Sequence, residues 1–262
     1  MRVAAGQAAS VGGDLDANVR TAARLTRLAA TQGVRLLVLP EAFLTGYDVA
    51  AFDGPLPDAD GLDAGWLEPL RAEAAAGVTV VVGTALRRGS ERRLSQIVVR
   101  PDGRADAPYD KQHLDGLEKT FFTVGDHGTS IEVDGLELGL SVCYDGCFPE
   151  HAQAAARDGA VGYLSSAAYF PGGAHRRDLY YAARAVENGM YVVLSGLTGR
   201  CGGFDFIGGS AVYDPEGRPL ARLADEEGLA IADLDAALVA QTRATHTMIG
   251  DHRADLGPRV RA

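Results

Sequence analysis

Short apolar runs alternate with amphipathic stretches along most of this chain of 262 residues. Strand-like runs fall at 3–7, 35–39, 78–82, 161–165 and 190–195. Helical periodicity occurs at 15–30, 64–76, 149–158, 175–188 and 235–243. Asp14 is placed to cap the first helix, and Gly33 and Gly77 follow the first two helices, as helix-terminating glycines do. The order of elements predicts strands that alternate with helices.

The remaining apolar runs are paired around turn residues and predict hairpins. The pairs are 94–100 with 104–109, 130–133 with 136–142, and 210–213 with 219–223, and a further strand is expected at 229–233. Hairpins mixed with helix connections predict a mixed sheet covered by helices. Because no linker or repeat interrupts the pattern, we expect an α/β fold in one domain, residues 1–262, with two stacked sheets and the helices outside.

Composition narrows the class of protein. The formal net charge of −10 argues against nucleic acid as a partner, since binding to phosphates needs a basic surface. No apolar run approaches ~20 residues and the first residues already form a strand pattern, so we expect no membrane span and a cytoplasmic location. Three cysteines, Cys143, Cys147 and Cys201, suit a reducing compartment and lack the spacing of a zinc site. We therefore expect no metal.

Three ionisable side chains follow directly on predicted strands. Glu41 follows the strand at 35–39, Lys111 follows the hairpin strand at 104–109, and Cys143 ends the strand at 136–142. Strand ends at one edge of a sheet are where α/β proteins gather catalytic groups. Taken singly, Cys143 could equally be a buried structural cysteine, and Glu41 and Lys111 could be solvated loop charges.

Together these three groups are suited to nucleophilic catalysis. A thiolate is the reactive form of cysteine, and a carboxylate with a raised pKa can accept the thiol proton. An ammonium group, with the backbone N–H after the cysteine, can stabilise the oxyanion of a tetrahedral intermediate. Glu118, seven residues after Lys111, is a further candidate that would orient Lys111 or the leaving amine. The set predicts acyl transfer from an amide or nitrile carbon.

The motifs around these residues resemble those of the nitrilase superfamily of carbon–nitrogen hydrolases. The matching segments lie at 40–47, 109–114 and 143–150, and flanking similarities occur in order at 1–7, 13–18, 122–126, 183–188 and 209–217. The resemblance implies a Glu41–Lys111–Cys143 triad, with Glu41 as general base, Lys111 stabilising the oxyanion and Cys143 as nucleophile, and it makes Glu118 a fourth active-site carboxylate. It also implies a four-layer α-β-β-α sandwich, a homodimer joined through its helices, and no metal or organic cofactor.

The residues after the nucleophile favour one branch of that superfamily. Cys143-Tyr144-Asp145 resembles amidases and carbamoyl hydrolases, whereas nitrile-cleaving members usually have Cys-Trp-Glu. We expect hydrolysis of a small carboxamide to a carboxylate and ammonia through a thioester. Tyr47, Tyr144, Ala168 and Tyr169 are candidate substrate-pocket residues, although Tyr47 and Tyr169 could equally be core aromatics.

Other functions remain compatible with these residues. The nearest alternatives are an N-carbamoyl (ureido) amidohydrolase and a nitrilase, which would share the triad and differ in pocket shape. A non-catalytic interaction protein with the same fold is a further alternative. The triad argues against it, because such a protein has no need of these three residues. A thiol redox protein using Cys143 and Cys147 is less favoured, because redox motifs usually place the two thiols as Cys-X-X-Cys.

Overall fold

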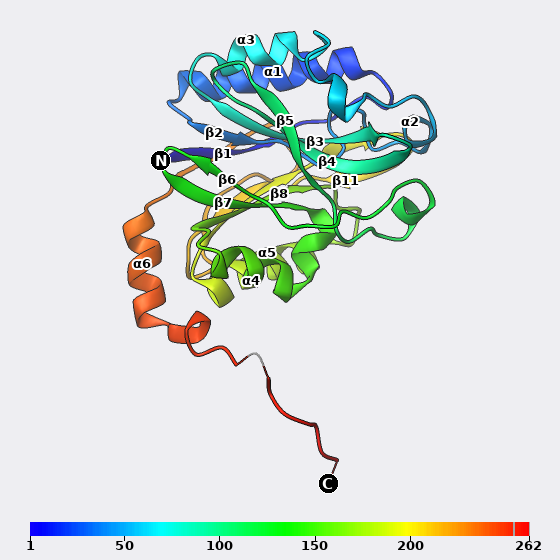
Figure 1. Cartoon of the computed structure of the whole chain (residues 1–262). Coiled ribbons are helices and arrows are strands. Elements are labelled where there is room, and N and C mark those ends of the chain that lie inside the picture. The colour runs from blue at the N-terminus through cyan, green and yellow to red at the C-terminus, as the bar shows by residue number, and fades with distance from the viewer. Residues whose placement is uncertain (254, 262) are drawn as a thin grey trace.

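Two six-stranded sheets lie face to face between two layers of helices (Figure 1). This computed structural model describes residues 1–253 and 255–261. The first sheet has the order β14-β1-β2-β3-β4-β5, with β1 (Arg2–Gln7), β2 (Leu36–Val38), β3 (Thr79–Arg88), β4 (Glu91–Val99), β5 (Ala105–Asp110) and β14 (Gly228–Asp233). In it β1, β2 and β3 run parallel and the outer pairs are antiparallel.

The second sheet repeats this mixture of parallel and antiparallel pairs. Its order is β13-β12-β9-β8-β7-β6, with β6 (Ser130–Val133), β7 (Leu136–Val142), β8 (Gly162–Ala167), β9 (Tyr191–Gly196), β12 (Ala211–Tyr213) and β13 (Pro219–Arg222). Strands β7, β8 and β9 are parallel. A separate small ribbon pairs β10 (Thr198–Cys201) with β11 (Phe204–Ile207), which the sequence patterns did not predict.

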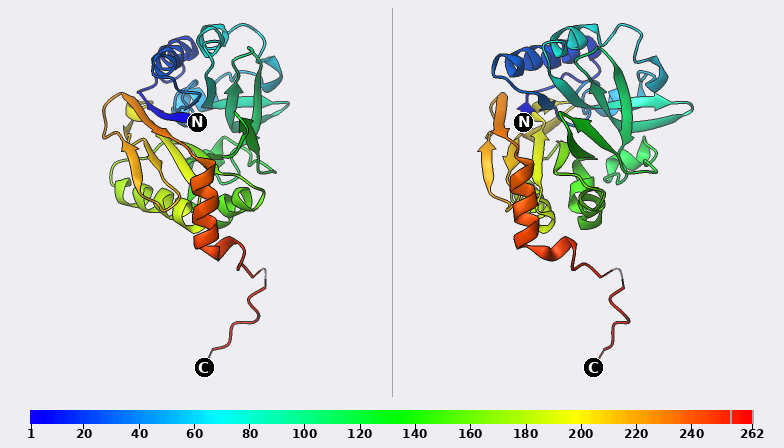
Figure 2. Two further views of the ribbon diagram at one scale, coloured as in Figure 1. Left: turned by 90° about the vertical axis from the view of Figure 1, so that its left-hand side faces the viewer. Right: turned by 60° about the vertical axis from the view of Figure 1, so that its left-hand side comes forward.

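Helices cover the outer face of each sheet (Figures 1 and 2). α1 (Leu15–Thr31) and α3 (Glu68–Ala74) lie on the first sheet, and α4 (Pro149–Arg157) and α5 (Ala174–Asn188) lie on the second. α6 (Ala236–Thr245) runs along one side, and residues 255–261 extend away from the body (Figure 2). The short helices are α2 (Val49–Asp53), η1 (Ala59–Gly61), η2 (Leu117–Thr120), η3 (Cys143–Cys147) and η4 (Thr247–Ile249). The predicted four-layer α-β-β-α sandwich is confirmed.

The alternation of side chains along β1 shows how the layers form. Val3 and Ala5 point into the core between the sheets, where they join Leu36 and Val38 of β2. Ala4 points the other way, into the core beneath α1. Successive residues of a strand face opposite sides of the sheet, so a strand buried on both sides reads as a continuous apolar run. Three cores result, one between the sheets and one beneath each helical layer.

The predicted helix at 64–76 is shorter in the structure. α3 begins only at Glu68, and Gly65 before it has φ of +86°. This left-handed conformation suits a turn and is costly inside a helix, so residues 64–67 form bends and turns instead. The strand predicted at 78–82 is longer than expected, since β3 continues to Arg88 and pairs with β4 across a tip at Gly89.

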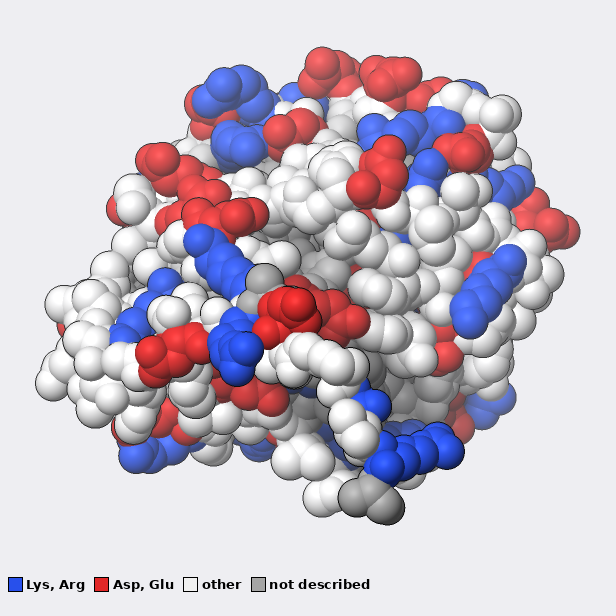
Figure 3. Space-filling view, turned by 60° about the horizontal axis from the view of Figure 1, so that its bottom comes forward, with Lys and Arg blue, Asp and Glu red and all other residues white. Residues whose placement is uncertain are grey.

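Charged side chains of both signs are interspersed on the face shown in Figure 3, so neither sign covers it as a broad field. Among the described residues, no helix combines the length and the apolar character needed to cross a membrane.

Gly83 of β3 lets the loop that carries Glu41 approach the first sheet. Its N–H donates to Pro40 O at 3.1 Å, and an added Cβ would lie 2.3 Å from that oxygen and 2.7 Å from Glu41 Cα. Both contacts are to backbone, which cannot swing away as a long side chain can. The position therefore requires glycine because of close packing.

We predict that Gly83→Ala lowers the free energy of unfolding by about 1–3 kcal/mol and displaces Glu41, because a methyl group must push the loop away. Urea unfolding measures the first effect. Gly128→Ala is the matched control, since a Cβ at Gly128 would meet nothing within 4 Å and the residue has no positive φ. Equal stability of the two variants would contradict the close-packing argument.

Candidate active site

Glu41 and Lys111 lie in the loops that follow β2 and β5, and they converge with Cys143, the first residue of η3 directly after β7. Lys111 Nζ lies 2.6 Å from Glu41 Oε1, and both residues are 1% exposed. Cys143 is half-buried, beside this pair. Burying an ammonium group is costly unless it is paired, so the contact with Glu41 is part of what keeps Lys111 in the interior.

Glu118 completes the pairing of Lys111. Both of its carboxylate oxygens lie 2.7 Å from Lys111 Nζ. The same carboxylate accepts hydrogen bonds from the Tyr47 hydroxyl at 3.0 Å and from the Asp115 N–H at 2.8 Å. Tyr47 was a candidate pocket residue, and the structure places it in the core against Glu118, behind the cavity rather than among the residues that line it.

Burial and the neighbouring charges set the proton affinities of this cluster. Burial raises the pKa of Glu41 to about 8, with Lys111 opposing the rise and Glu118 adding to it. Burial acts to lower the pKa of Lys111, but the charges of Glu41 and Glu118 outweigh it and hold that pKa well above its usual range. Lys111 therefore stays a cation, and Glu41 is a much stronger base than an ordinary carboxylate.

The turn that carries Cys143 is strained and is held by three hydrogen bonds. Cys143 has φ of +44°, a conformation that side-chain-bearing residues rarely adopt. The Tyr181 hydroxyl of α5 donates to Cys143 O at 2.9 Å, and Arg184 Nε of the same helix donates to Gly146 O at 2.9 Å. On the other side, Asp145 Oδ2 accepts the N–H of Val142 at 3.0 Å. Such strain persists only where the surroundings over-determine the conformation.

Asp145 connects this turn to a buried polar network. Besides Val142, it accepts the backbone N–H of His113 at 2.9 Å and the Tyr109 hydroxyl at 2.6 Å, and its Oδ1 lies 2.9 Å from His113 Nδ1. Tyr109 in turn lies 2.8 Å from His151 Nε2. Despite burial, these hydrogen bonds, that of His113 foremost, lower the pKa of Asp145. His113 is thus a partner of the turn that carries Cys143, and the sequence had predicted no role for Asp145.

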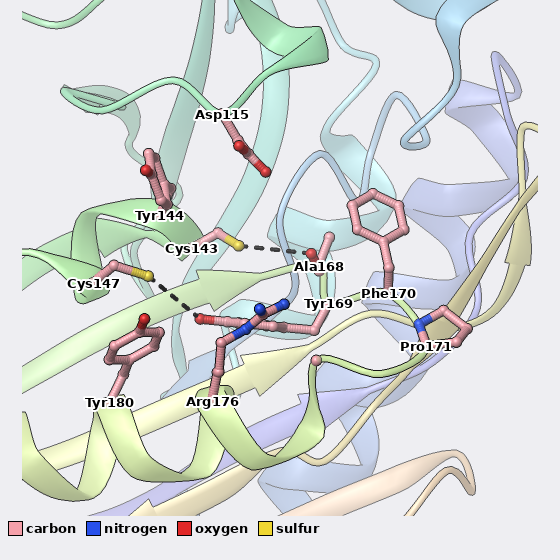
Figure 4. A pocket seen from close by; sticks show the side chains of 11 residues that line it. Asp115, Cys143, Tyr144, Cys147, Ala168, Tyr169, Phe170, Pro171, Arg176 and Tyr180 are labelled. Carbon is pink, nitrogen blue, oxygen red and sulfur yellow. Dashed lines mark hydrogen bonds between the residues drawn. The ribbon is translucent and has the colours of Figure 1, made fainter.

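The thiol of Cys143 faces a cavity of about 330 Å³ (Figure 4). Its Sγ lies 3.6 Å from Ala168 O. Burial raises the pKa of the Cys143 thiol well above its usual range, and the charge of Glu41 adds to this rise. The resting nucleophile is therefore a thiol that needs a base to ionise it.

The cavity brings together three of the four candidate pocket residues, Tyr144, Ala168 and Tyr169. Phe170, whose aromatic ring next to Tyr169 made it a further possible part of the pocket wall, also lines the cavity. Sequence reasoning missed the other side chains of the wall, which are Asp115, Cys147, Pro171, Arg176 and Tyr180. For two of them a signal was present, because residues four apart in the predicted helix share one face and Arg176 and Tyr180 have that spacing. Cys147 lies on this wall with its Sγ 4.0 Å from the Tyr169 hydroxyl.

Among the described residues, no group of three or more His, Cys, Asp or Glu side chains lies together in a way that could hold a metal ion. Glu41, Lys111 and Glu118 pair with one another, and Asp145 is paired with His113.

The chain belongs to the carbon–nitrogen hydrolase family, whose profile matches residues 2–244. It is 34% identical to the 2-oxoglutaramate amidase of Bacillus subtilis (strain 168), over 84% of this chain and 86% of that protein. It is 33% identical to a nitrilase of Pyrococcus abyssi, over 87% of each chain. Among solved structures, it superposes on the amidase of Nesterenkonia sp. AN1 with a TM-score of 0.85 and 32% identity, over 97% of both chains. Another structure of that amidase, a mutant, carries the acetamide moiety of fluoroacetamide covalently added at its active-site cysteine.

We predict that Glu41→Gln lowers the pKa of the Cys143 thiol, because it removes a negative charge that opposes the thiolate and leaves Lys111 in place. The ultraviolet absorbance of the thiolate, followed against pH, measures this pKa. The same titration of a Cys143→Ala protein supplies the background from the other two cysteines. An unchanged or higher thiol pKa in Glu41→Gln would contradict the electrostatic coupling.

Proposed function

We propose that this protein hydrolyses the C–N bond of a small carboxamide, giving a carboxylate and ammonia through a thioester on Cys143. The observation that carries the proposal is the buried Glu41–Lys111 contact of 2.6 Å next to a thiol that opens onto a small cavity. A basic carboxylate, a fixed cation and a nucleophile are the three groups that acyl transfer needs. The amidases among its relatives support the same reaction.

In the first half-reaction, Glu41 accepts the proton of Cys143 as the sulfur attacks the carbonyl carbon. The carbonyl oxygen becomes an oxyanion, which the ammonium of Lys111 stabilises together with the backbone N–H that follows the nucleophile. When the tetrahedral intermediate collapses, Glu41 returns the proton to the leaving nitrogen and ammonia departs. The acyl group remains on the sulfur as a thioester.

In the second half-reaction, water attacks the thioester carbon and Glu41 accepts a proton from it. Lys111 stabilises the second oxyanion, the C–S bond breaks and the thiol recovers its proton. Glu118 is a positioning residue in this scheme. Tyr47 and the Asp115 N–H orient its carboxylate, and the carboxylate fixes Lys111 Nζ.

We further propose amides rather than ureido compounds or nitriles as the substrates, on the motif Cys143-Tyr144-Asp145 and the amidase relatives. Because the relative from Pyrococcus abyssi is a nitrilase, the substrates tested must include short nitriles. Ammonia release from matched amides, N-carbamoyl amino acids and nitriles separates the three activities. Tyr144, Ala168 and Tyr169 would contact the acyl group from the cavity wall.

The cellular setting is also part of this proposal. Cys143, Cys147 and Cys201 are all free, which suits a reducing cytoplasm. We propose a single domain that assembles as a homodimer through the helical layer of α4 and α5. Leu179 and Val186 of α5 support this, because they are 57% and 43% exposed and a partner would cover them. Sedimentation of Leu179→Glu against the parent chain tests it.

We predict that Cys143→Ala abolishes turnover and leaves the circular dichroism spectrum unchanged, because it removes the nucleophile and little packing. Mass spectrometry of the parent protein with a short amide should detect an acyl adduct on Cys143. Cys201→Ala is the matched control, since this thiol is buried near Ser10 and is not among the cavity-lining residues. Near-normal activity of Cys143→Ala, or an adduct elsewhere, would refute the assignment.

We predict that kcat/KM falls as the pH drops through the pKa of Glu41, since the base must be ionised to accept the thiol proton. Burial raises that pKa to about 8, so the acid limb should lie well above the 4.5 of an ordinary glutamate. The charge of Glu118 contributes to the raised pKa of Glu41. In Glu118→Gln, the acid limb of the remaining activity should therefore lie at lower pH than in the parent protein. A limb centred near 4.5 in the parent protein would contradict Glu41 as the base.

A further inference from the structure

A half-buried histidine outside the reacting groups forms short hydrogen bonds that connect the two sheets. His151 lies in the first turn of α4, and both of its ring nitrogens have a partner. Its Nε2 lies 2.8 Å from the hydroxyl of Tyr109 near the end of β5, and its Nδ1 lies 2.8 Å from the hydroxyl of Tyr163 in β8. The Tyr109 hydroxyl in turn lies 2.6 Å from Asp145 Oδ2. The proposed chemistry assigns no role to this histidine.

The partners in this chain of hydrogen bonds fix which atom carries each proton. Burial acts to raise the pKa of Asp145, but its hydrogen bonds lower that pKa, so the carboxylate only accepts. Tyr109 must therefore donate its single proton to Asp145, and its oxygen must accept from His151 Nε2–H. Burial lowers the pKa of His151, although the charge of Asp145 opposes this. The ring is therefore neutral, and its Nδ1 accepts the hydroxyl of Tyr163.

Only one order of donors is consistent with these contacts, from Tyr163 to His151, then to Tyr109 and finally to Asp145. His151 and Tyr109 each accept one hydrogen bond and donate another, and chains of this kind strengthen their members. In the other neutral tautomer, with the hydrogen on Nδ1, the bare Nε2 would compete with Asp145 for the Tyr109 proton. The tautomer of His151 therefore determines whether Tyr109 donates to Asp145.

Asp145 is the point at which this chain of hydrogen bonds meets the reacting groups. Besides the Tyr109 hydroxyl, its carboxylate accepts the backbone N–H of His113. These two residues lie two positions before and two positions after Lys111, and Asp145 itself lies two positions after Cys143. Lys111 follows a strand of the first sheet and Cys143 follows a strand of the second. The carboxylate therefore ties together the segments that carry the cation and the nucleophile.

The alternative role for His151 is in a separate cavity of about 290 Å³, which its side chain also lines. A ligand there would need a free ring nitrogen. Both nitrogens are already in hydrogen bonds at 2.8 Å, so the contacts favour a role within the protein's own network.

We propose that His151 is a positioning residue of the hydrolase, whose Nε2–H directs the Tyr109 hydroxyl onto Asp145. Through that carboxylate it holds Cys143 in place relative to Lys111. This role goes beyond the proposed amidase function, on which its kinetic test rests. His151 is not among the residues that line the cavity of Cys143. It therefore affects kcat, which depends on the alignment of the reacting groups, and leaves KM nearly unchanged.

The test compares two substitutions of His151 that differ in their ability to donate. His151→Leu removes the donor and should lower kcat by about 10- to 100-fold with KM within about twofold, because a small displacement of a nucleophile is costly. His151→Gln can donate to Tyr109 from its amide and should recover kcat to within about fivefold of the parent protein. Tyr109→Phe should lose at least as much as His151→Leu. The double variant should lose no more than Tyr109→Phe, since the two residues act in one chain.

Tyr191→Phe is the matched control for the loss of a buried hydroxyl. The Tyr191 hydroxyl accepts the N–H of Asp235 at 3.2 Å, but Tyr191 begins β9, at the end of the sheet opposite Cys143. Its kcat should equal that of the parent protein. The tautomer is measured without substrate, by nitrogen NMR of protein with isotope-labelled histidine. His151 should carry its hydrogen on Nε2, and the spectrum of His151→Gln identifies its signals.

An unchanged kcat in His151→Leu, or equal losses in His151→Leu and His151→Gln, would overturn this inference and leave the amidase function standing. A hydrogen on Nδ1, or losses that multiply in the double variant, would overturn it as well. If His151→Leu does not fold, the tautomer and the kcat of His151→Gln still decide. Failure of every amide to release ammonia or to acylate Cys143 would reject the amidase function itself, whereas the tautomer of His151 would still be measured.

Discussion

The whole site depends on one buried cation, the ammonium of Lys111. A charge withdrawn from water must be paired, and Lys111 is paired with Glu41 and Glu118, which lie 70 residues before it and seven residues after it. One cation between two carboxylates leaves excess negative charge, so one of the acids must bind a proton easily. Glu118 is satisfied by Lys111, Tyr47 and the Asp115 N–H. Glu41 Oε2 is buried without a hydrogen-bond partner among the described residues, which makes Glu41 the acid that takes the proton.

Helix α5 links the two other requirements of the site, a fixed nucleophile and a shaped cavity. Its buried face carries Tyr181 and Arg184, whose hydrogen bonds hold the carbonyls of Cys143 and of Gly146, three residues later, so that the strained turn is fixed. Its next face carries Arg176 and Tyr180, which line the cavity. Because a helix is rigid over this length, movement of the nucleophile turn and movement of the cavity wall are coupled through it.

The positions of Glu41, Lys111 and Cys143 at strand ends could be predicted, because apolar runs locate the strands and polar residues directly after them lie at a sheet edge. Glu41 and Lys111 follow strands of the first sheet, whereas Cys143 follows a strand of the second, so their convergence also depends on how the two sheets stack. The partners of Asp145 could not be predicted in this way, since the hydrogen bonds to Val142, His113 and Tyr109 depend on how loops fold back. Periodicity also overestimated the helix at 64–76, because composition does not reveal that Gly65 takes a positive φ.

Tyr47 illustrates the same limit on the pocket side. An aromatic residue near a catalytic motif can face the substrate or the core. For a tyrosine, the hydrogen-bond partner of the hydroxyl group determines which of the two the side chain faces. In the structure that hydroxyl needs a buried acceptor and finds it in Glu118, so the ring packs among Phe52, Phe204 and Phe206. The residue belongs with the charged cluster, although its sequence neighbourhood is equally compatible with a place in the cavity.

The site is thus divided at Cys143 into a dry interior and an open cavity. Glu41, Lys111 and Glu118 lie behind the thiol and are almost inaccessible, so only the reacting carbonyl end of a substrate can reach them. The cavity wall comes from Asp115 and from residues within 144–147 and 168–180, and the two parts meet where the Asp115 N–H donates to Glu118. In the proposed mechanism, the charges of the interior transfer the proton and the side chains of the wall contact the acyl chain. Because Glu41, Lys111 and Glu118 are not among the residues that line the cavity, a substitution on the wall leaves these charged groups in place.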